Sequence, residues 1–268
     1  MKHIGYQFPT DNEGRTPFHD AAQFGQLEVC KYFIKNFKDK NPASDLTGHT
    51  PLHAVLDCKK DKYKIFKLIV DNVMDKNPND FEGNTPLHYL AWRGDLKLFK
   101  YLYSKVKEKN PKDTNGRTLL HEAVDGGQLS TVKFICKVTK DKNPKDNGGY
   151  TPLHIAASKN HVDIYKYIMK FVKDKNPKDD DGYTPLHMAA MEKRMDVYKM
   201  ILENVKEKNP KNNDGETPLD LAMDDFIEML KEARQNPSTK NLQLENDLEE
   251  KGEKKKGLLS KFLNFFRK

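Results

Sequence analysis

The chain has 268 residues, and its 47 lysines and arginines outnumber its 40 aspartates and glutamates, for a net charge of +7. The three cysteines, Cys30, Cys58 and Cys136, are odd in number and form no Cys-x-x-Cys pair, which argues against a disulfide framework and predicts reduced thiols. No run approaches the roughly 18 apolar residues of a membrane span, and the first residues lack the apolar core of a signal peptide. We therefore expect a soluble, intracellular chain.

One short segment recurs along the chain at a nearly constant spacing. Each copy begins with threonine, and the intervals between successive copies are 34, 35, 33, 33, 33 and 33 residues. The seven threonines are Thr16, Thr50, Thr85, Thr118, Thr151, Thr184 and Thr217. A fixed period of this length predicts a stack of small structural units, each of which buries its apolar face against the next.

The fifth copy illustrates the structure expected of one unit. Thr151 is a good helix N-cap and Pro152 suits the first helical position, so a short helix is expected to begin here. Gly149 allows the positive φ of a tight turn just before that helix. Apolar residues over 162–172 recur at helical spacing and predict a second, amphipathic helix, which we expect to run slightly long and to stop at Asn176 before a proline.

The best copies read Gly-Tyr-Thr-Pro-Leu-His-Ile-Ala-Ala from Gly149 and Gly-Tyr-Thr-Pro-Leu-His-Met-Ala-Ala from Gly182. This segment, its period and its phase resemble the ankyrin repeat over roughly residues 11–233. The resemblance implies an all-α solenoid with β-turn or hairpin fingers and a shortened last unit as its C-terminal cap. The predicted domains are a lead-in over residues 1–10, an array of seven units over 11–234, a charged linker over 235–256 and an amphipathic tail helix over 257–268.

Histidine follows the threonine in six copies, in the pattern Thr-x-x-His. Successive histidines fall one per unit, about the 10 Å packing distance of helices apart, which is too far for two of them to share a zinc ion with bonds of about 2 Å. The resemblance implies a structural role for these histidines and threonines, in which the imidazole bonds backbone groups near the turns. The histidines are His19, His53, His88, His121, His154 and His187. We expect no metal site and no cofactor, and no catalytic motif occurs, so the sequence favours a protein that is not an enzyme.

The resemblance also implies a concave groove, lined by the positions around the turn glycine and just after the Ala-Ala pair. Tryptophan, tyrosine and arginine fall in these columns, and these residue types dominate the hot spots of protein interfaces. The alternative is that the tyrosines only cover the turns. The predicted partner-binding residues are Arg15, Phe24, Phe81, Trp92, Arg93, Arg117, Tyr150, Lys159, Tyr183, Met191, Glu192 and Glu216.

The tail from residue 257 combines an apolar face with a basic flank. At 100° per residue its leucines and phenylalanines occupy one arc, and lysines precede and follow them. This pattern fits an interfacial helix on an anionic membrane, and equally an amphipathic helix that docks on protein. The predicted docking residues are Lys254, Lys255, Lys256, Leu258, Leu259, Phe262, Leu263, Phe265 and Phe266.

These patterns together predict a non-catalytic scaffold or adaptor that binds an extended or loop segment of a protein partner in the groove. A peripheral membrane tether that uses the tail, and a regulatory inhibitor that sequesters a partner segment, are the alternatives. The lysines of the turns alternate with carboxylates, which does not favour a nucleic-acid partner. We expect a cytoplasmic location, peripheral at a membrane if the tail binds lipid, and nothing in the sequence excludes the nucleus.

Overall fold

The computed structural model describes residues 9–222, which contain thirteen α-helices and one short 3₁₀-helix. The end of the predicted cap unit, the linker and the tail helix lie outside the described residues, as does most of the lead-in. The chain divides into two compact units, and the boundary falls between Thr139 and Lys140. The all-α prediction is confirmed for the described residues, which contain no β-strand and only one isolated β-bridge, between Lys112 and Thr118.

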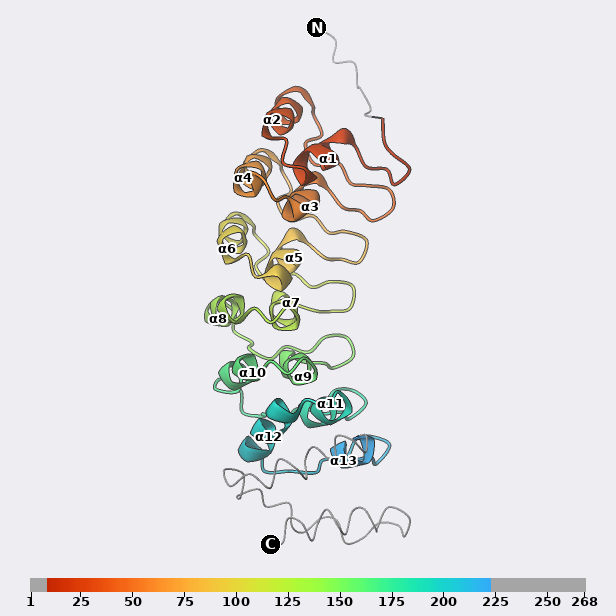
Figure 1. Ribbon diagram of the computed structural model, residues 1–268, viewed down its shortest axis with the longest axis vertical. Coiled ribbons are helices and arrows are strands. Elements are labelled where there is room, and N and C mark those ends of the chain that lie inside the picture. The colour runs from red at the N-terminus through yellow and green to blue at the C-terminus, as the bar shows by residue number, and fades with distance from the viewer. Residues whose placement is uncertain (1–8, 223–268) are drawn as a thin grey trace. The chain divides into compact units, whose positions relative to one another are not determined.

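Unit 1 contains four pairs of helices, and each pair has a first helix and a second helix. The first helices are α1 (Pro17–Gln23), α3 (Pro51–Ala54) with its continuation η1 (Val55–Asp57), α5 (Pro86–Arg93) and α7 (Leu119–Asp125). The second helices are α2 (Leu27–Asn36), α4 (Lys62–Asn72), α6 (Leu96–Lys105) and α8 (Leu129–Val138). The first helices stack in one row and the second helices in another (Figure 1).

Unit 2 continues the same pattern. It contains α9 (Pro152–Ser158), α10 (Val162–Ile168), α11 (Pro185–Met191), α12 (Met195–Asn204) and α13 (Pro218–Leu221). Helix α11 packs against both α9 and α13, and α10 packs against α12. The second helix expected after α13 falls on residues outside the described range, so the count of seven complete repeats stays a prediction.

Every first helix begins immediately after its threonine, as the sequence predicts. The threonine has an extended backbone in all seven cases, and its side chain and that of the third helical residue form a capping box. Histidine takes the position that glutamate or glutamine usually holds in such a box. Proline is the first helical residue in six of these helices, and Leu119 takes that place in α7.

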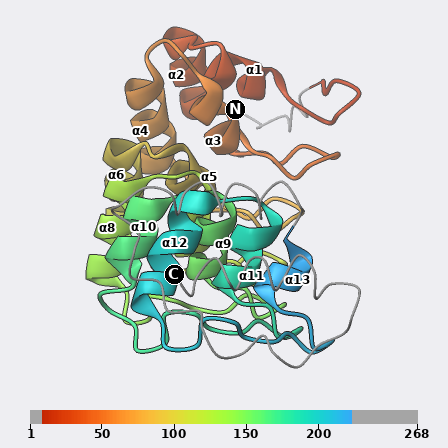
Figure 2. The ribbon, with the colours of Figure 1, turned by 60° about the horizontal axis from the view of Figure 1, so that its bottom comes forward.

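The segment before each threonine forms a finger that points away from the second helices (Figure 2). In most fingers one aspartate closes the turn; Asp80 Oδ1, for example, accepts the backbone N–H groups of Glu82 and Asn84 at 3.0 and 2.8 Å. Gly83 has a φ of 80°, and a Cβ there would lie 2.7 Å from the backbone nitrogen of Thr114 in the next finger. That nitrogen donates to the Glu82 carbonyl, so close approach of adjacent backbones requires the glycine.

The prediction that the second helices run long, to Asn-Pro, is wrong. Helix α10 ends at Ile168, eight residues before Asn176, and α4 ends at Asn72, where Val73 takes an extended backbone. A lysine of the following loop replaces the usual glycine cap: Lys76 Nζ donates to the carbonyls of Val70 and Val73, both at 2.7 Å. Because this ammonium group satisfies carbonyls that the helix leaves free, the helix can end without a left-handed residue.

The same loop also caps the next first helix. Asn77 donates its backbone N–H to Asp75 at 3.0 Å, and its side-chain oxygen accepts the backbone N–H of Leu87, in the first turn of α5, at 3.0 Å. Asn41, Asn143 and Asn176 make the equivalent bonds to Leu52, Leu153 and Leu186 at 3.0 to 3.1 Å. The Asp-Lys-Asn-Pro sequence over 75–78 is therefore a connector that caps one helix at its end and another at its start, and its asparagine cap recurs in the other copies.

We predict that Asn77→Ala destabilises the chain by about 1 kcal/mol, because the first turn of α5 loses a side-chain acceptor. Asn79→Ala is the matched control, since Asn79 is exposed and lies two residues farther along the same loop. Urea unfolding of both variants measures the difference. Equal stability of the two variants would show that the capping bond contributes nothing.

Candidate partner-binding surface

The threonine and histidine of each repeat form a hydrogen-bonded frame. His19 Nδ1 accepts the backbone N–H of Thr16 at 3.0 Å, and its Nε2 lies 2.9 Å from the carbonyl oxygen of His49 in the next repeat. His154 Nε2 makes the same contact with the Tyr183 carbonyl, at 3.1 Å. Because an amide N–H can only donate, Nδ1 is the acceptor and Nε2 carries the proton, which fixes the neutral tautomer.

The frame recurs in the other repeats with small differences. His187 Nε2 lies 3.2 Å from the Glu216 carbonyl. In His53 and His88 the Nδ1 bond to threonine is kept at 3.1 Å, whereas Nε2 lies outside hydrogen-bonding geometry. In the last copy Asp220 replaces histidine and accepts from both the backbone N–H and the hydroxyl of Thr217. All of these threonines and histidines are buried.

The fingers and first helices of unit 1 form what we call its finger side, and this side exposes large apolar residues. Phe24 follows the end of α1 and is 68% exposed, and Trp92, in the last turn of α5, is 48% exposed. Leu46 and Phe81 lie on adjacent fingers and are 65% and 64% exposed. The Phe81 ring covers Gly48, where an added Cβ would lie 2.7 Å from it. The predicted apolar groove residues of unit 1 are therefore accessible.

The predicted groove arginines are held by ion pairs within the chain. Arg93 donates to the Leu56 carbonyl at 2.7 Å and to Asp57 at 2.5 Å. This bond fixes the arginine beside Trp92, its neighbour in the sequence, and couples two adjacent repeats. Arg93 therefore orients the edge of the surface, and its charge is already largely balanced there.

Two more arginines pair inside their own repeats, each with a carboxylate five residues farther along the chain. Arg15 pairs with Asp20 at 3.0 Å, and Arg117 pairs with Glu122 at 2.9 Å. Burial raises the pKa of Glu122 to about 7, and Arg117 opposes that rise. Glu122 thus titrates near neutral pH on the finger side, and protonation removes one charge partner of Arg117.

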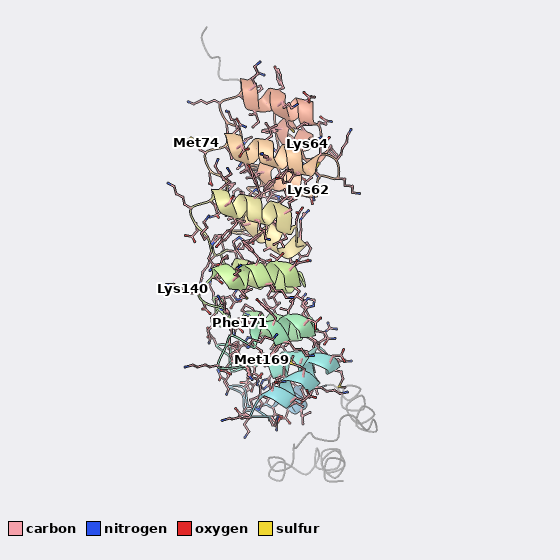
Figure 3. All side chains as sticks on the ribbon, turned by 90° about the vertical axis from the view of Figure 1, so that its left-hand side faces the viewer. Lys62, Lys64, Met74, Lys140, Met169 and Phe171 are labelled. Atoms are coloured by element: carbon pink, nitrogen blue, oxygen red, sulfur yellow. The ribbon has the colours of Figure 1, made fainter. Side chains whose placement is uncertain are left out.

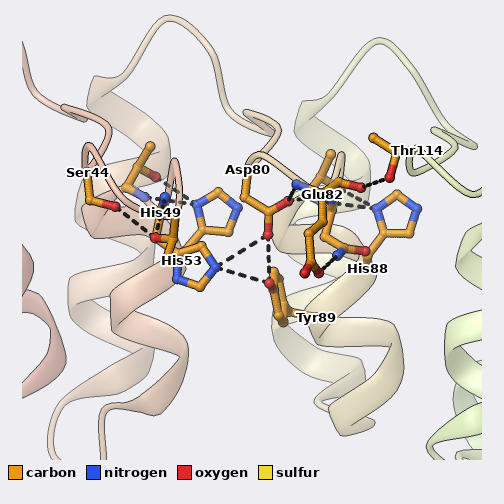
Figure 4. Close-up of polar contacts among 12 residues, drawn as sticks. Ser44, His49, His53, Asp80, Glu82, His88, Tyr89 and Thr114 are labelled. Carbon is orange, nitrogen blue, oxygen red and sulfur yellow. Dashed lines mark hydrogen bonds and ion pairs between the residues drawn. The ribbon is translucent and has the colours of Figure 1, made fainter. Parts of the chain in front are cut away.

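A polar network joins the second and third repeats in a place that the sequence did not indicate (Figure 4). The Tyr89 hydroxyl donates to Asp80 Oδ2 at 2.7 Å, and His49 Nε2 lies 3.1 Å from the same hydroxyl and 3.3 Å from the same carboxylate. The His49 ring also stacks on the frame residue His53, with centroids 5.2 Å apart. The only sequence signal was Tyr89 itself, a tyrosine directly after the repeat histidine.

Unit 2 presents a different surface at the equivalent positions. Tyr150 and Tyr183 pack on His154 and His187, with ring centroids 5.2 and 5.6 Å apart. This packing fits the alternative in which the tyrosines cover the turns. Glu216 is partly engaged, because its carboxylate accepts from the Asn212 side chain at 3.0 Å. The exposed predicted residues of unit 2 are Lys159, Met191 and Glu192.

Within residues 9–222 no three His, Cys, Asp or Glu side chains converge as a metal ion requires. All three cysteines are buried and unpaired with one another, and burial raises the pKa of the Cys30 thiol to about 12. None of the helices in this range is long and apolar enough to cross a membrane.

Comparison with known proteins identifies the repeat. The family model for ankyrin repeats matches residues 2–80, 38–113, 87–179 and 168–241. The chain is 32% identical over 83 residues to neurogenic locus notch homolog protein 1 of Xenopus laevis, and 30% identical over 90 residues to human ankyrin repeat domain-containing protein 53. It is also 30% identical over 92 residues to putative ankyrin repeat protein L371 of Acanthamoeba polyphaga mimivirus. These matches cover 31%, 33% and 34% of this chain but only 3%, 17% and 12% of the relatives.

The buried histidines predict a loss of stability in mild acid. Burial lowers the pKa of His154 from 6.5 to about 4. Below about pH 6.5 this histidine therefore binds a proton in the unfolded chain but stays neutral in the folded chain. The contribution of His154 to the free energy of unfolding is complete above the unfolded pKa and decreases as the pH falls toward 4. The slope contributed by one such histidine approaches about 1.4 kcal/mol per pH unit.

Urea unfolding of the intact chain and of His154→Gln from about pH 7 to about pH 5 isolates this contribution. The variant is expected to be less stable at neutral pH but to lose less stability on acidification. Other titrating groups, Glu122 included, affect both proteins alike and cancel in the comparison. Parallel stability curves would contradict the prediction.

Proposed function

The chain belongs to the ankyrin repeat family, and we propose that it is a scaffold or adaptor that binds a protein segment on the finger side. Ankyrin repeats are in general a protein-protein interaction module, without chemistry of their own. The observation that supports a finger-side site here is the set of large apolar side chains exposed on rigid elements of unit 1. Monomeric proteins seldom leave several such residues together at the surface without use.

Trp92 is the proposed anchor of this surface in unit 1. It is the sole tryptophan of the chain, about half of its surface is accessible, and its neighbour Arg93 is held in place by Asp57. Below it in the stack, Gly126 packs so closely that an added Cβ would lie 1.9 Å from the Trp92 carbonyl oxygen. A rigid aromatic residue with a fixed backbone loses little entropy on binding, which is the property of interface hot spots.

The fingers of unit 2 suggest the charge of the segment that would lie against them. Asp180, Asp181 and Asp214 are exposed around the glycine turns, and Glu192 follows α11. Lys145 lies 3.9 Å from Asp180. Unit 2 therefore suits a basic stretch of the partner, which would speed association and set its direction.

The other functions considered from the sequence remain alternatives. A regulatory inhibitor would use the same finger-side contacts to sequester a partner segment. A membrane tether would use the tail residues from Lys254 to Phe266, which lie outside the described part of the chain. A cytoplasmic location, at a membrane or away from it, fits each of these proposals.

We predict that Trp92→Ala weakens binding of the cognate partner by about 2 kcal/mol or more, because the anchor of the surface is lost. Affinity capture from a lysate, with the intact chain and the variant in parallel, identifies proteins that depend on this residue. Purified candidates then give the affinity by titration of the sole tryptophan's fluorescence in the intact chain and by calorimetry for the variant.

Tyr32→Ala is the matched control, since Tyr32 is an aromatic residue that is 60% exposed on the second helix α2 of the same unit. It is expected to retain every partner that Trp92→Ala loses. A partner that binds both variants as tightly as the intact chain would place the binding site elsewhere than the finger side.

A further inference from the structure

The lysines of unit 1 are concentrated on its second helices. Helices α2, α4, α6 and α8 carry ten lysines against two carboxylates, Glu28 and Asp71, a net charge of +8. The first helices of the unit, with η1, carry one arginine against four carboxylates, a net charge of −3. In unit 2, α10 is neutral and α12 carries −1. The excess positive charge is thus a property of one face of unit 1, which we call its outer side.

The lysines form a regular array on this outer side. Each of the four second helices of unit 1 carries a lysine at the equivalent position, directly after a buried residue. All four of these lysines are exposed. The row consists of Lys31, Lys67, Lys100 and Lys133. Other lysines, such as Lys64 and Lys97, lie about one helical turn before the row. Figure 3 shows the helices of this side, with Lys62 and Lys64 at one end of α4. Because packed helices lie about 8 to 10 Å apart, the charges extend in two dimensions.

The two carboxylates of the outer side are already engaged. Glu28 pairs with Lys31 at 2.6 Å, and Asp71 accepts the hydroxyl of Tyr101. The middle helices α4 and α6 carry six lysines against Asp71 alone. They keep a net positive charge even when Asp61, which precedes α4 and pairs with Lys64 at 2.8 Å, is counted. An array of like charges attracts a surface of opposite charge.

We propose that the outer side of unit 1 is a docking surface for an anionic lipid bilayer. A leaflet rich in phosphatidylserine is a plane of negative charge, and it matches a two-dimensional array better than a single line of phosphates does. Each lysine near such a surface contributes favourably, and the attraction falls off within a Debye length of about 8 Å at physiological salt. Docking therefore brings the second helices close to the headgroups.

The aromatic residues among the lysines favour lipid over nucleic acid. Lys97 Nζ lies 4.1 Å from the centre of the Tyr63 ring, and Lys100 Nζ lies 5.2 Å from that of Phe134. These ring faces already carry an ammonium group, whereas a nucleic-acid base needs an open ring face for stacking. Tyrosine and lysine with an apolar stem are, in contrast, well suited to the interface between headgroups and water.

The kind of basic residue points the same way. Within residues 9–222 all four arginines, Arg15, Arg93, Arg117 and Arg194, make ion pairs with carboxylates, and none lies on a second helix. The outer side of unit 1 presents lysine alone. Lysine is a compact point charge that suits diffuse attraction, whereas arginine is the residue of shaped, bidentate phosphate recognition.

The test is co-sedimentation of the full chain with vesicles of equimolar phosphatidylserine and phosphatidylcholine. The row variant carries Lys31→Gln, Lys67→Gln, Lys100→Gln and Lys133→Gln, and we expect it to bind these vesicles about tenfold more weakly or worse. Binding of the intact chain should weaken as salt is raised and should be absent with phosphatidylcholine alone. Thermal unfolding of the variant verifies that glutamine at these exposed positions leaves the fold intact.

The control variant removes the same charge elsewhere in unit 1, through Lys38→Gln, Lys59→Gln, Lys107→Gln and Lys112→Gln, all exposed and outside the second helices. It should keep most of the binding. An equal loss in both variants would show that only the net charge of the chain matters, and it would overturn the proposal. The comparison is repeated with Phe262→Ser and Phe266→Ser in both backgrounds. If these tail changes abolish binding and the row variant has no effect, the tail is the lipid contact and the outer side is not.

A duplex oligonucleotide provides the remaining comparison. We expect it to bind the intact chain less tightly than the anionic vesicles do at the same salt concentration. Tighter binding of the duplex, lost in the row variant, would make the outer side a nucleic-acid surface. No sedimentation of the intact chain with anionic vesicles at low salt would likewise overturn the proposal.

Discussion

The neutral histidine that links one repeat to the next is the contact on which the other features depend. Its Nδ1 accepts from the threonine that starts the helix, and its Nε2 donates to a backbone carbonyl of the following repeat, as His154 does to Tyr183. One side chain thus fixes the start of a helix, the tautomer of its own ring and the distance to the next finger. Protonation of Nδ1 would remove the first of these bonds, and burial disfavours the charged ring, which is why burial holds the pKa of His154 near 4.

The sequence was a reliable guide wherever one residue type has a single physical role. Threonine before proline predicted six of the seven first helices, and Gly83, with its φ of 80°, lies where a side chain would strike the next finger. The ends of the second helices were mispredicted because the stop signal was assigned to Asn176 and its proline. At the end of α4 the side chain of Lys76 satisfies the last carbonyls, and a flexible lysine cannot be recognised as a cap from composition alone.

Long-range partners explain the rest of what sequence reasoning missed. Arg93 was identified as an exposed binding residue, but its carboxylate partner, Asp57, lies in the preceding repeat, so their proximity depends on how the repeats stack. The link from His49 to Tyr89 spans 40 residues, so the tyrosine after the repeat histidine could not by itself indicate its partner. The lysine row was hidden for another reason: its members are 33 to 36 residues apart, and it becomes a surface only when the second helices align. The turn lysines, which alternate with acids in the sequence, drew attention away from it.

The residue before each threonine has two separable roles, and this separation allows the fold to carry variable surfaces. Where the frame is complete, its backbone carbonyl accepts the Nε2–H of the histidine in the preceding repeat, as in His49, Tyr183 and Glu216. The side chain of the same residue takes no part in that bond. The frame uses only the backbone atom, so it places no demand on the identity of the side chain. Charged, aromatic and amide residues therefore occupy this column at little cost in stability. A surface that changes character along the array, while the stack beneath it stays the same, follows directly from a frame built of threonine, histidine and backbone.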